Sequence, residues 1–228
     1  ISFVSVIRQG KNALLYLFFI WYNYKKHFKT NVHCHMENCE VESMKKNILF
    51  VASEAVPFIK TGGLADVAGS LPKYFDKEQY DVRVMLPKYL CIPEKWRSQM
   101  KYVTHFYMDL AWRSQYVGVL EMEYAGVHYY FIDNEFYFAG PKPYGYIHED
   151  IEKFAFFSKA ALSAMPLLNF KPDIVHCHDW QTGLVPVYMK ERFHDGEFFR
   201  DMKSVMTIHN LKFQGVWDLQ KVKDITGL

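Results

Sequence analysis

From residue 47 onward, short apolar runs alternate with stretches of helical periodicity. The apolar runs have the length of buried strands and end in, or are followed by, proline or polar residues: Asn47–Ala52, Asp81–Pro87, Pro172–Asp179 and Lys203–Ile208. Between them, the spacing of apolar residues predicts three helices: Gly63–Phe75, Ile151–Leu168 and Thr182–Glu191, the last disturbed by Pro186. This alternation predicts an α/β domain built on a mostly parallel, helix-covered sheet.

The middle of the chain has a different pattern. From Tyr102 to Phe138, alternating and aromatic segments predict three or four further strands. Two of these, Val117–Tyr124 and Val127–Ile132, flank the turn Ala125-Gly126. We therefore expect an antiparallel inset within the parallel sheet.

The first 43 residues differ from the rest. Ala13–Tyr24 is apolar and flanked by basic residues, but it is shorter than the roughly 20 residues of a membrane span. No small-residue cleavage site of a secretory signal follows it. Met44 directly precedes the first strand, so we interpret it as the natural start. We expect residues 1–43 to be an extension outside the fold and residues 44–228 to be the folded domain; a membrane-surface anchor is the competing interpretation.

Composition narrows the class of protein. Half of the 228 residues are hydrophobic and 18% are aromatic, enough for a sizeable core. The net charge of +2 gives no argument for nucleic-acid binding. Four scattered cysteines fit a reducing cytoplasm. Cys34 and Cys39, near His33 and His35, are a candidate metal site, but an unstructured polar segment is the favoured interpretation because no second ligand pair follows.

The motif Lys60-Thr61-Gly62-Gly63-Leu64-Ala65-Asp66 follows the first strand. Adjacent glycines permit unusual φ values and close approach of a ligand to the backbone. A helix that follows them directs free N–H groups and its positive dipole end at an anion, and Lys60 adds a full charge. The motif is neither GxGxxG nor the Walker pattern. It predicts a phosphorylated ligand without identifying the reaction.

Polar residues follow three of the predicted strands: Glu54 and Lys60, His178-Asp179, and His209-Asn210. Parallel strands deliver their ends to one rim, where ligands bind in such sheets. Each of these residues could also have a purely structural role and bind no ligand. Lys60 fits an exposed turn, Asp179 a helix cap and His209 a core position. We expect His176 to pack in the sheet rather than form a metal pair with His178.

Three segments in order, NILFVASEAVPFIKTGGLADVAGSLP, DIVHCHDWQTGLVP and SVMTIHNLKFQG, closely resemble bacterial glycogen synthases and plant starch synthases, the family 5 retaining glucosyltransferases. The resemblance runs from about Met44 to Leu228. It implies the N-terminal half of a two-domain GT-B fold, a Rossmann-like sheet with helices on both faces. It also implies ADP-glucose as donor and the non-reducing end of an α-1,4-glucan as acceptor, in a cytoplasmic enzyme without nucleic-acid or membrane partners.

The resemblance also assigns roles. Its substrate-binding residues are Lys60, for the donor phosphates, with Gly62, Gly63, Asp66 and Asn210, and its catalytic residues are Asp179 and His209. It implies no metal and no cofactor, so that cationic side chains neutralise the leaving diphosphate. Retention is thought to proceed by front-face attack, in which Asp179 orients or stabilises rather than forming a covalent bond.

The chain departs from the family at one motif, and we expect the family's second domain to lie outside these 228 residues. Lys153 stands where the family commonly has arginine after an acidic pair, which would weaken a bidentate contact. The nucleotide pocket and a key glutamate belong to the family's second domain, so we expect this chain alone to be inactive. Two other functions stay open: a non-catalytic glucan-binding module, and a GT-B enzyme that uses another nucleotide sugar.

Overall fold

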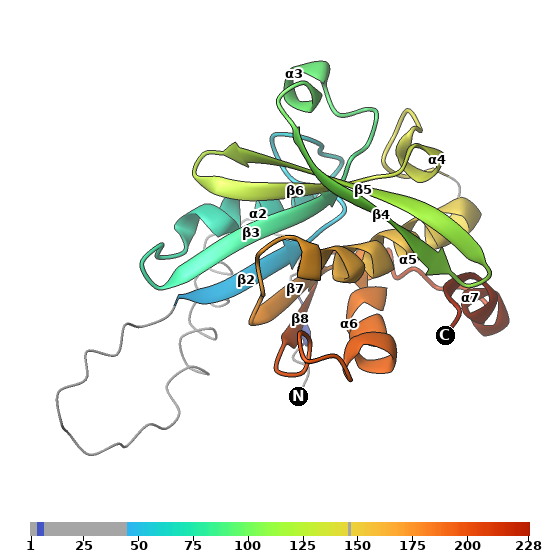
Figure 1. Cartoon of the computed structure of the whole chain (residues 1–228). Helices are drawn as coiled ribbons and strands as arrows, with labels where there is room; N and C mark the ends of the chain where they lie inside the picture. The colour runs from blue at the N-terminus through green and yellow to red at the C-terminus, as the bar shows by residue number, and fades with distance from the viewer. Residues whose placement is uncertain (1–3, 7–44, 146) are drawn as a thin grey trace, which may run out of the picture.

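The computed structural model describes residues 4–6, 45–145 and 147–228, which form one eight-stranded sheet covered by helices (Figure 1). The strand order is β1-β8-β7-β2-β3-β6-β5-β4. The six strands β1-β8-β7-β2-β3-β6, in this spatial order, are parallel to their neighbours. The last two, β5 and β4, each run antiparallel to the strand beside them. The strand bounds are β1 Val4–Val6, β2 Lys46–Val51, β3 Tyr80–Pro87, β4 Lys101–Leu110, β5 Arg113–Tyr124, β6 Val127–Asp133, β7 Ile174–His178 and β8 Lys203–Ile208.

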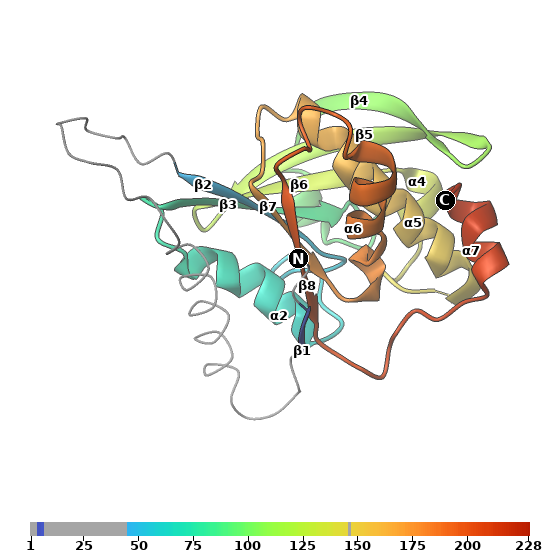
Figure 2. The same cartoon turned by 90° about the horizontal axis from the view of Figure 1, so that it is seen from below.

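Helices cover both faces of the sheet. The chain crosses from β2 to β3 in one direction and from β6 to β7 in the other, so right-handed connections place their helices on opposite faces. One face therefore carries α2, and the other carries α5 and α6 (Figure 2). The helical elements are α2 Gly63–Ser70, η1 Leu71–Tyr74, α3 Glu94–Arg97, α4 Glu135–Phe138, α5 Ile147–Ala164, η2 Met165–Leu167, η3 Trp180–Thr182, α6 Leu184–Tyr188, η4 Met189–Phe193 and α7 Leu219–Thr226.

The mostly parallel sheet and its antiparallel inset are confirmed, but all three predicted helices differ in detail. The helix expected over Ile151–Leu168 begins earlier, at Ile147, and tightens to 3-10 geometry at Met165, directly before Pro166. The helix expected over Gly63–Phe75 tightens from α to 3-10 geometry at Leu71, directly before Pro72, which has no N–H to donate. The helix expected over Thr182–Glu191 is wrong as a single α-helix, because a 3-10 turn, a short α-helix and a π-helical turn follow one another around Pro186.

The N-terminal stretch is described at only three positions. Val4–Val6 pairs in parallel with β8 at the edge of the sheet. The rest of the expected extension lies outside the described residues, as do Met44 and the candidate metal ligands Cys34 and Cys39. The domain boundary at residue 44 therefore stays a prediction.

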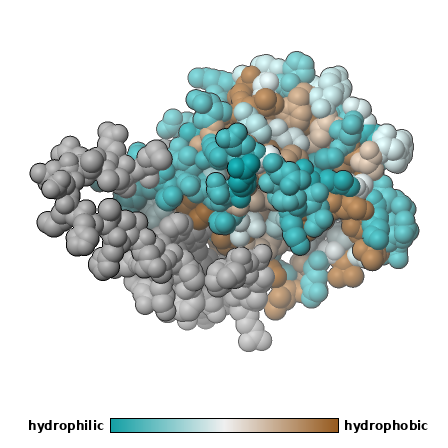
Figure 3. All heavy atoms as spheres, turned by 60° about the horizontal axis from the view of Figure 1, so that its bottom comes forward, coloured by the Kyte–Doolittle hydropathy of each residue, from teal (hydrophilic) through white to brown (hydrophobic). Residues whose placement is uncertain are grey.

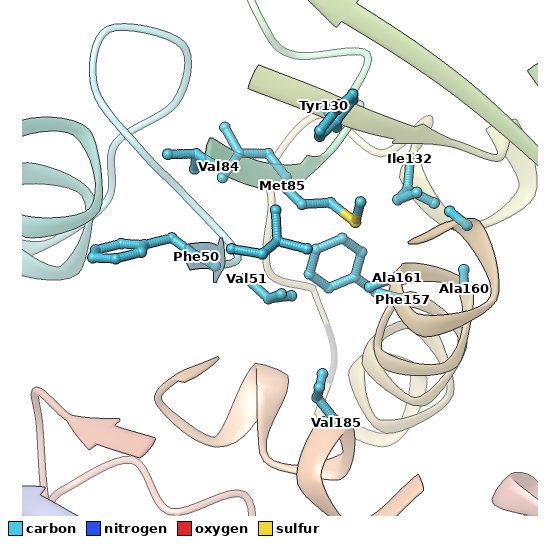
Figure 4. Packing of buried hydrophobic residues seen from close by; sticks show 14 of the residues in the cluster. Phe50, Val51, Val84, Met85, Tyr130, Ile132, Phe157, Ala160, Ala161 and Val185 are labelled. Carbon is cyan, nitrogen blue, oxygen red and sulfur yellow. The ribbon is translucent and has the colours of Figure 1, made fainter. Parts of the chain in front are cut away.

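The centre of the core is β2. It has neighbours on both edges and helices over both faces, so Ile48–Val51 is fully buried. Small residues on α5, Ala160 and Ala161, allow that helix to approach the sheet closely. Figure 4 shows the resulting cluster, with Phe50, Val51, Val84, Met85, Tyr130, Ile132, Phe157, Ala160, Ala161 and Val185 packed together.

The described surface is mostly hydrophilic when seen from the side shown in Figure 3, with smaller hydrophobic patches between. Trp112 and Phe136 are the most exposed large apolar side chains of the described residues, at 82% and 80%. Within those same residues, no helix has the length and apolar character needed to cross a bilayer.

Gly69 on α2 lies against the loop that carries the glycine motif. A Cβ atom there would lie 2.3 Å from the Val56 carbonyl oxygen, although alanine has the better helix propensity by about 1 kcal/mol. We expect Gly69→Ala to lower the free energy of unfolding by about 1–3 kcal/mol in urea titrations, since overpacking outweighs propensity. Ser70→Ala, one residue further along α2, is the control. A Gly69→Ala variant as stable as the parent would contradict this close packing.

Candidate active site at the carboxyl ends of β2, β7 and β8

The site lies where the strand order reverses. The chain leaves β2 for β3 on one side, and β7 lies on the other side of β2. Connections that depart in opposite directions open a crevice at the carboxyl ends of these strands, which is where open α/β sheets bind ligands. The glycine motif follows β2, Asp179 follows β7, and His209 follows β8. The rim expected from the sequence is therefore present.

Lys60 and Asp66 form an ion pair at the start of α2. The Lys60 Nζ and Asp66 Oδ1 atoms are 2.7 Å apart, and both side chains are 53% exposed. Asp66 lies in the first turn of α2, where a carboxylate complements the helix dipole. A pair this exposed contributes only about 0–1 kcal/mol to stability. Breaking the ion pair therefore costs little free energy, so Lys60 can leave Asp66 and bind another anion.

The glycines of the motif do not adopt the unusual φ values expected from the sequence. Gly62 has φ −152° and ψ −167°, an extended conformation open to any residue, and Gly63 is the first residue of α2. Apart from residues 61–63 themselves, no described atom lies within 4 Å of the position that a Cβ on Gly62 would occupy. Neither backbone conformation nor packing within the described structure thus requires glycine at 62. Because Gly62 has no side chain, the space above the N-terminus of α2 is open.

Glu54 is buried and holds the loop that presents Lys60. Its Oε1 accepts hydrogen bonds from Thr61 Oγ1 at 2.9 Å and from Tyr144 OH at 3.1 Å. Its Oε2 accepts from the Thr61 backbone N–H. The Tyr144 hydroxyl also lies 2.8 Å from Ser53 Oγ. Glu54 therefore fixes both ends of the segment between β2 and the glycine motif.

Tyr144 was not identified from the sequence, because it lies in a glycine- and proline-rich loop without periodicity. Burial raises its pKa far above the ordinary value, so the hydroxyl stays neutral and donates to Glu54. Lys153 anchors the same loop: its Nζ contacts Asp150 Oδ1 at 2.6 Å and the Pro143 carbonyl oxygen at 2.9 Å. Lys153 therefore links α5 to this loop through one nitrogen atom, Nζ, which contacts both Asp150 and the Pro143 carbonyl oxygen.

Asp179 has a strained backbone that its neighbours hold in place. Its φ of 57° and ψ of −178° lie in a region that strongly favours glycine, at a cost of roughly 1–3 kcal/mol. Its N–H donates to the Thr207 carbonyl oxygen at 2.9 Å, and its Oδ1 accepts from the His209 N–H at 2.6 Å. The helix-cap interpretation is wrong, since the carboxylate makes no hydrogen bond to η3 within the described structure.

The environment of Asp179 shifts its titration. Burial raises the pKa of the carboxyl from 3.8 to about 6. Hydrogen bonds from the backbone amides of His209 and Asn210 oppose this rise, and the charge of Glu54 adds to it. At neutral pH the carboxylate is therefore mostly ionised, although it is only 8% exposed.

Three buried histidines stack beneath Asp179. The His176 and His178 rings are 4.3 Å apart, and His178 Nδ1 lies 2.9 Å from His209 Nε2. Burial lowers the pKa of His176 to about 3 and of His209 to about 4, and that of His178 falls well below its ordinary value. All three are neutral at pH 7. As expected, His176 packs in the sheet, where its Nε2 contacts Thr207 Oγ1 at 2.7 Å.

Asn210 shapes the turn that leaves the site. Its Oδ1 accepts from the Lys212 N–H at 2.9 Å, and its carbonyl oxygen accepts from the Phe213 N–H at 3.3 Å. The structure thus brings Asp179, His209 and Asn210 into one group and Lys60 and Asp66 into another. No cluster of three metal-ligating side chains occurs in the described part of the chain.

An apolar cavity of about 490 Å³ adjoins this group. It lies between α5, η3, β8 and the segment that follows Asn210, and its aromatic lining includes Phe154, Trp180, Phe213 and Trp217. Trp180 directly follows Asp179, so the cavity wall and the carboxylate share one turn of chain. The cavity is a neighbour of the polar site rather than part of it.

Comparison with known proteins places this geometry in a family. Residues 47–228 match the model described as the starch synthase catalytic domain. The chain is 76% identical over 183 residues to the glycogen synthase of Lachnospira eligens and 67% identical to that of Lachnoclostridium phytofermentans, covering 80% of this chain and 38% of each relative. The catalytic domain of starch synthase IV from Arabidopsis thaliana, bound to ADP and acarbose, aligns at 26% identity and a TM-score of 0.72, covering 81% of this chain and 38% of that one. The chain thus spans 38% of the length of these relatives.

Proposed function

This chain belongs to the starch synthase catalytic domain family, from which we propose that it is the N-terminal part of a glycogen synthase. The proposed enzyme transfers glucose from ADP-glucose to the non-reducing end of an α-1,4-glucan, with retention of configuration. The observation that carries the proposal is that a half-exposed lysine, an open helix N-terminus and a rigidly held Asp179–His209 group all follow the carboxyl ends of strands at the strand-order reversal. The names of the relatives agree with it.

The donor diphosphate is proposed to bind above Gly62. The N-terminus of α2 supplies free N–H groups and a positive dipole end, and Lys60 supplies a charge that exchanges Asp66 for the diphosphate. Positive charge placed there stabilises the leaving group in the transition state without a metal ion. The remaining basic residues are proposed to come from a second domain, so that this chain alone is inactive.

The donor glucose is proposed to lie against Asp179 and His209. A carboxylate that is ionised and fixed in direction stabilises the positive charge that develops on the sugar. The neutral His209 ring hydrogen-bonds a sugar hydroxyl. Asn210 holds the turn beside them, and the α-glucan acceptor approaches from the open side of the crevice.

The proposal is tested by a chimera, because the chain spans 38% of its relatives. This chain replaces the aligned part of the Lachnospira eligens enzyme, and incorporation of radiolabelled glucose into glycogen is measured. We expect the chimera to use ADP-glucose and the chain alone to be inactive. Activity with another nucleotide sugar in preference would contradict the donor. An inactive chimera whose malto-oligosaccharide binding survives Lys60→Ala and Asp179→Ala would favour a glucan-binding module.

Gly62→Ser separates ligand binding from folding. Serine is at least as good an N-cap as glycine, and its Cβ has open space, so we expect an unchanged free energy of unfolding. Its side chain would occupy the proposed diphosphate position and raise the KM for ADP-glucose in the chimera by about tenfold or more, equivalent to about 1.4 kcal/mol. Gly140→Ser, at an exposed glycine with room for a Cβ, is the matched control. An unchanged KM would place the diphosphate elsewhere.

A further inference from the structure

We propose that His178 is a positioning residue that sets the tautomer of His209, so that His209 presents an Nδ1–H donor to the active-site crevice. The donor's target, a sugar or phosphate oxygen, rests on the proposed function. The assignment of the proton rests only on the geometry of the two rings. Their Nδ1 and Nε2 atoms are 2.9 Å apart, within hydrogen-bond distance.

One proton is shared between the two facing nitrogens. Both rings are buried and neutral at pH 7, and a neutral imidazole has one N–H and one lone pair. A hydrogen bond between His178 Nδ1 and His209 Nε2 therefore requires one ring to donate and the other to accept. The two tautomers are coupled, and fixing one fixes the other.

The far nitrogen of His178 decides the direction. His178 Nε2 is enclosed and has no hydrogen-bond partner among the described residues. A buried N–H without an acceptor is rare and costly, whereas an unused lone pair costs less. The proton of His178 therefore resides on Nδ1, which donates to His209 Nε2. The proton of His209 must then reside on its Nδ1.

The His209 Nδ1 atom faces the open side of the pair. The hydrogen bonds of His209 within the described structure are its backbone N–H to Asp179 Oδ1 and its Nε2 to His178. Its Nδ1 is not among the enclosed polar atoms without partners, so it reaches solvent. The ring is also held at its backbone by Asp179, which leaves Nδ1–H as a fixed donor toward the crevice. A fixed donor suits an acceptor oxygen of the substrate.

The tautomers are read directly by two-bond ¹H–¹⁵N NMR correlation of the ¹⁵N-histidine-labelled chain at pH 7, with His209→Gln to assign the ring signals. We expect both His178 and His209 to carry their proton on Nδ1. A His209 ring protonated on Nε2 would overturn the proposal. This readout needs no substrate, so it stands apart from the proposed function.

Two variants test whether His178 sets the tautomer. His178→Phe keeps a ring but removes the donor, and we expect His209 to shift toward the Nε2–H form that free histidine prefers. His178→Asn places an amide N–H near the former Nδ1 position and is expected to restore the Nδ1–H form. A His209 tautomer that is identical in all three proteins would contradict a positioning role, and urea titrations check that each variant folds.

Activity in the chimera separates the two proposals. We expect His178→Phe to lower kcat about tenfold and His178→Asn to recover most of it, with KM for ADP-glucose changed less. If the tautomer shifts in His178→Phe while kcat and KM do not, the assignment of the proton stands and the sugar contact proposed for His209 fails.

Discussion

Lowering the pH from 7 to 5 is expected to remove several kcal/mol from the free energy of unfolding of this chain. His176, His178 and His209 have pKa values lowered by burial, so the folded state binds their protons more weakly than the unfolded state does. Their stabilising contribution is full above pH 6.5 and is lost as the pH falls toward about 4 and 3. Each histidine contributes up to about 1.4 kcal/mol per pH unit in this window.

Asp179 acts with the opposite sign. Its folded pKa of about 6 lies above 3.8, so its contribution is present below pH 3.8 and is lost as the pH rises through 6. On acidification Asp179 therefore offsets one of the three histidines between pH 6 and 4. The net slope approaches about 3 kcal/mol per pH unit, which is large against the total stability of a domain.

Urea titrations at pH 7, 6 and 5 measure this slope. His176→Gln removes one titrating group that is not in the proposed site, and we expect it to reduce the slope by about 1.4 kcal/mol per pH unit. His105→Gln, at an exposed histidine on β4, is the matched control for the exchange of histidine for glutamine. A free energy of unfolding that is the same at pH 7 and 5 would show that the three rings are not held neutral.

Asp179→Asn is expected to lower kcat of the chimera by about 10²–10³-fold while the fold persists. The asparagine Oδ1 can still accept the His209 N–H, so the substitution removes the charge and keeps the geometry. Removing a buried charge is expected to leave the free energy of unfolding at pH 7 unchanged or higher. In the parent chimera, kcat should rise with pH through about 6 as the carboxylate ionises.

Steady-state kinetics and urea titration of the same preparations check both statements. Asp195→Asn, in an exposed loop, is the control for loss of one negative charge. A variant that keeps more than about a tenth of the parent kcat would assign Asp179 a structural task, and the strain at its backbone would then need another explanation.

The fold could be predicted from the sequence where local pattern decides it. The first strand was predicted over Asn47–Ala52 and lies at Lys46–Val51, buried from Ile48 onward, because a run of apolar residues marks a strand that is covered on both faces. The alternation of such strands with helices predicts a parallel sheet. Pro186 was expected to disturb the helix over Thr182–Glu191, but the division of that helix into 3-10, α and π turns was not predicted. The short helix α7, Leu219–Thr226, was missed, because marginal helices depend on their packing partners.

The site was predictable to the extent that strand ends share a rim. That principle predicts that Asp179 and His209 lie close together, and the His209 N–H donates to Asp179 Oδ1. It did not find Tyr144, whose contact with Glu54 spans ninety positions of chain and depends on how one loop folds over another. Nor did it find the strained conformation of Asp179, since sequence pattern predicts the preferred backbone of a residue and strain is a departure from it.

Asp179 ties two strand ends together twice, once by its own N–H to the Thr207 carbonyl and once by its carboxylate to the His209 N–H. These two hydrogen bonds join the segment that follows β7 to the end of β8. Without them, the two segments would have to be brought together at each turnover. The relative placement of carboxylate and imidazole is therefore set during folding, and little reorganisation is left for the moment of reaction. Any closing motion in the chimera should carry this wall of the crevice as a rigid body, so crystallographic displacement factors for residues 178, 179, 207 and 209 should rise and fall together.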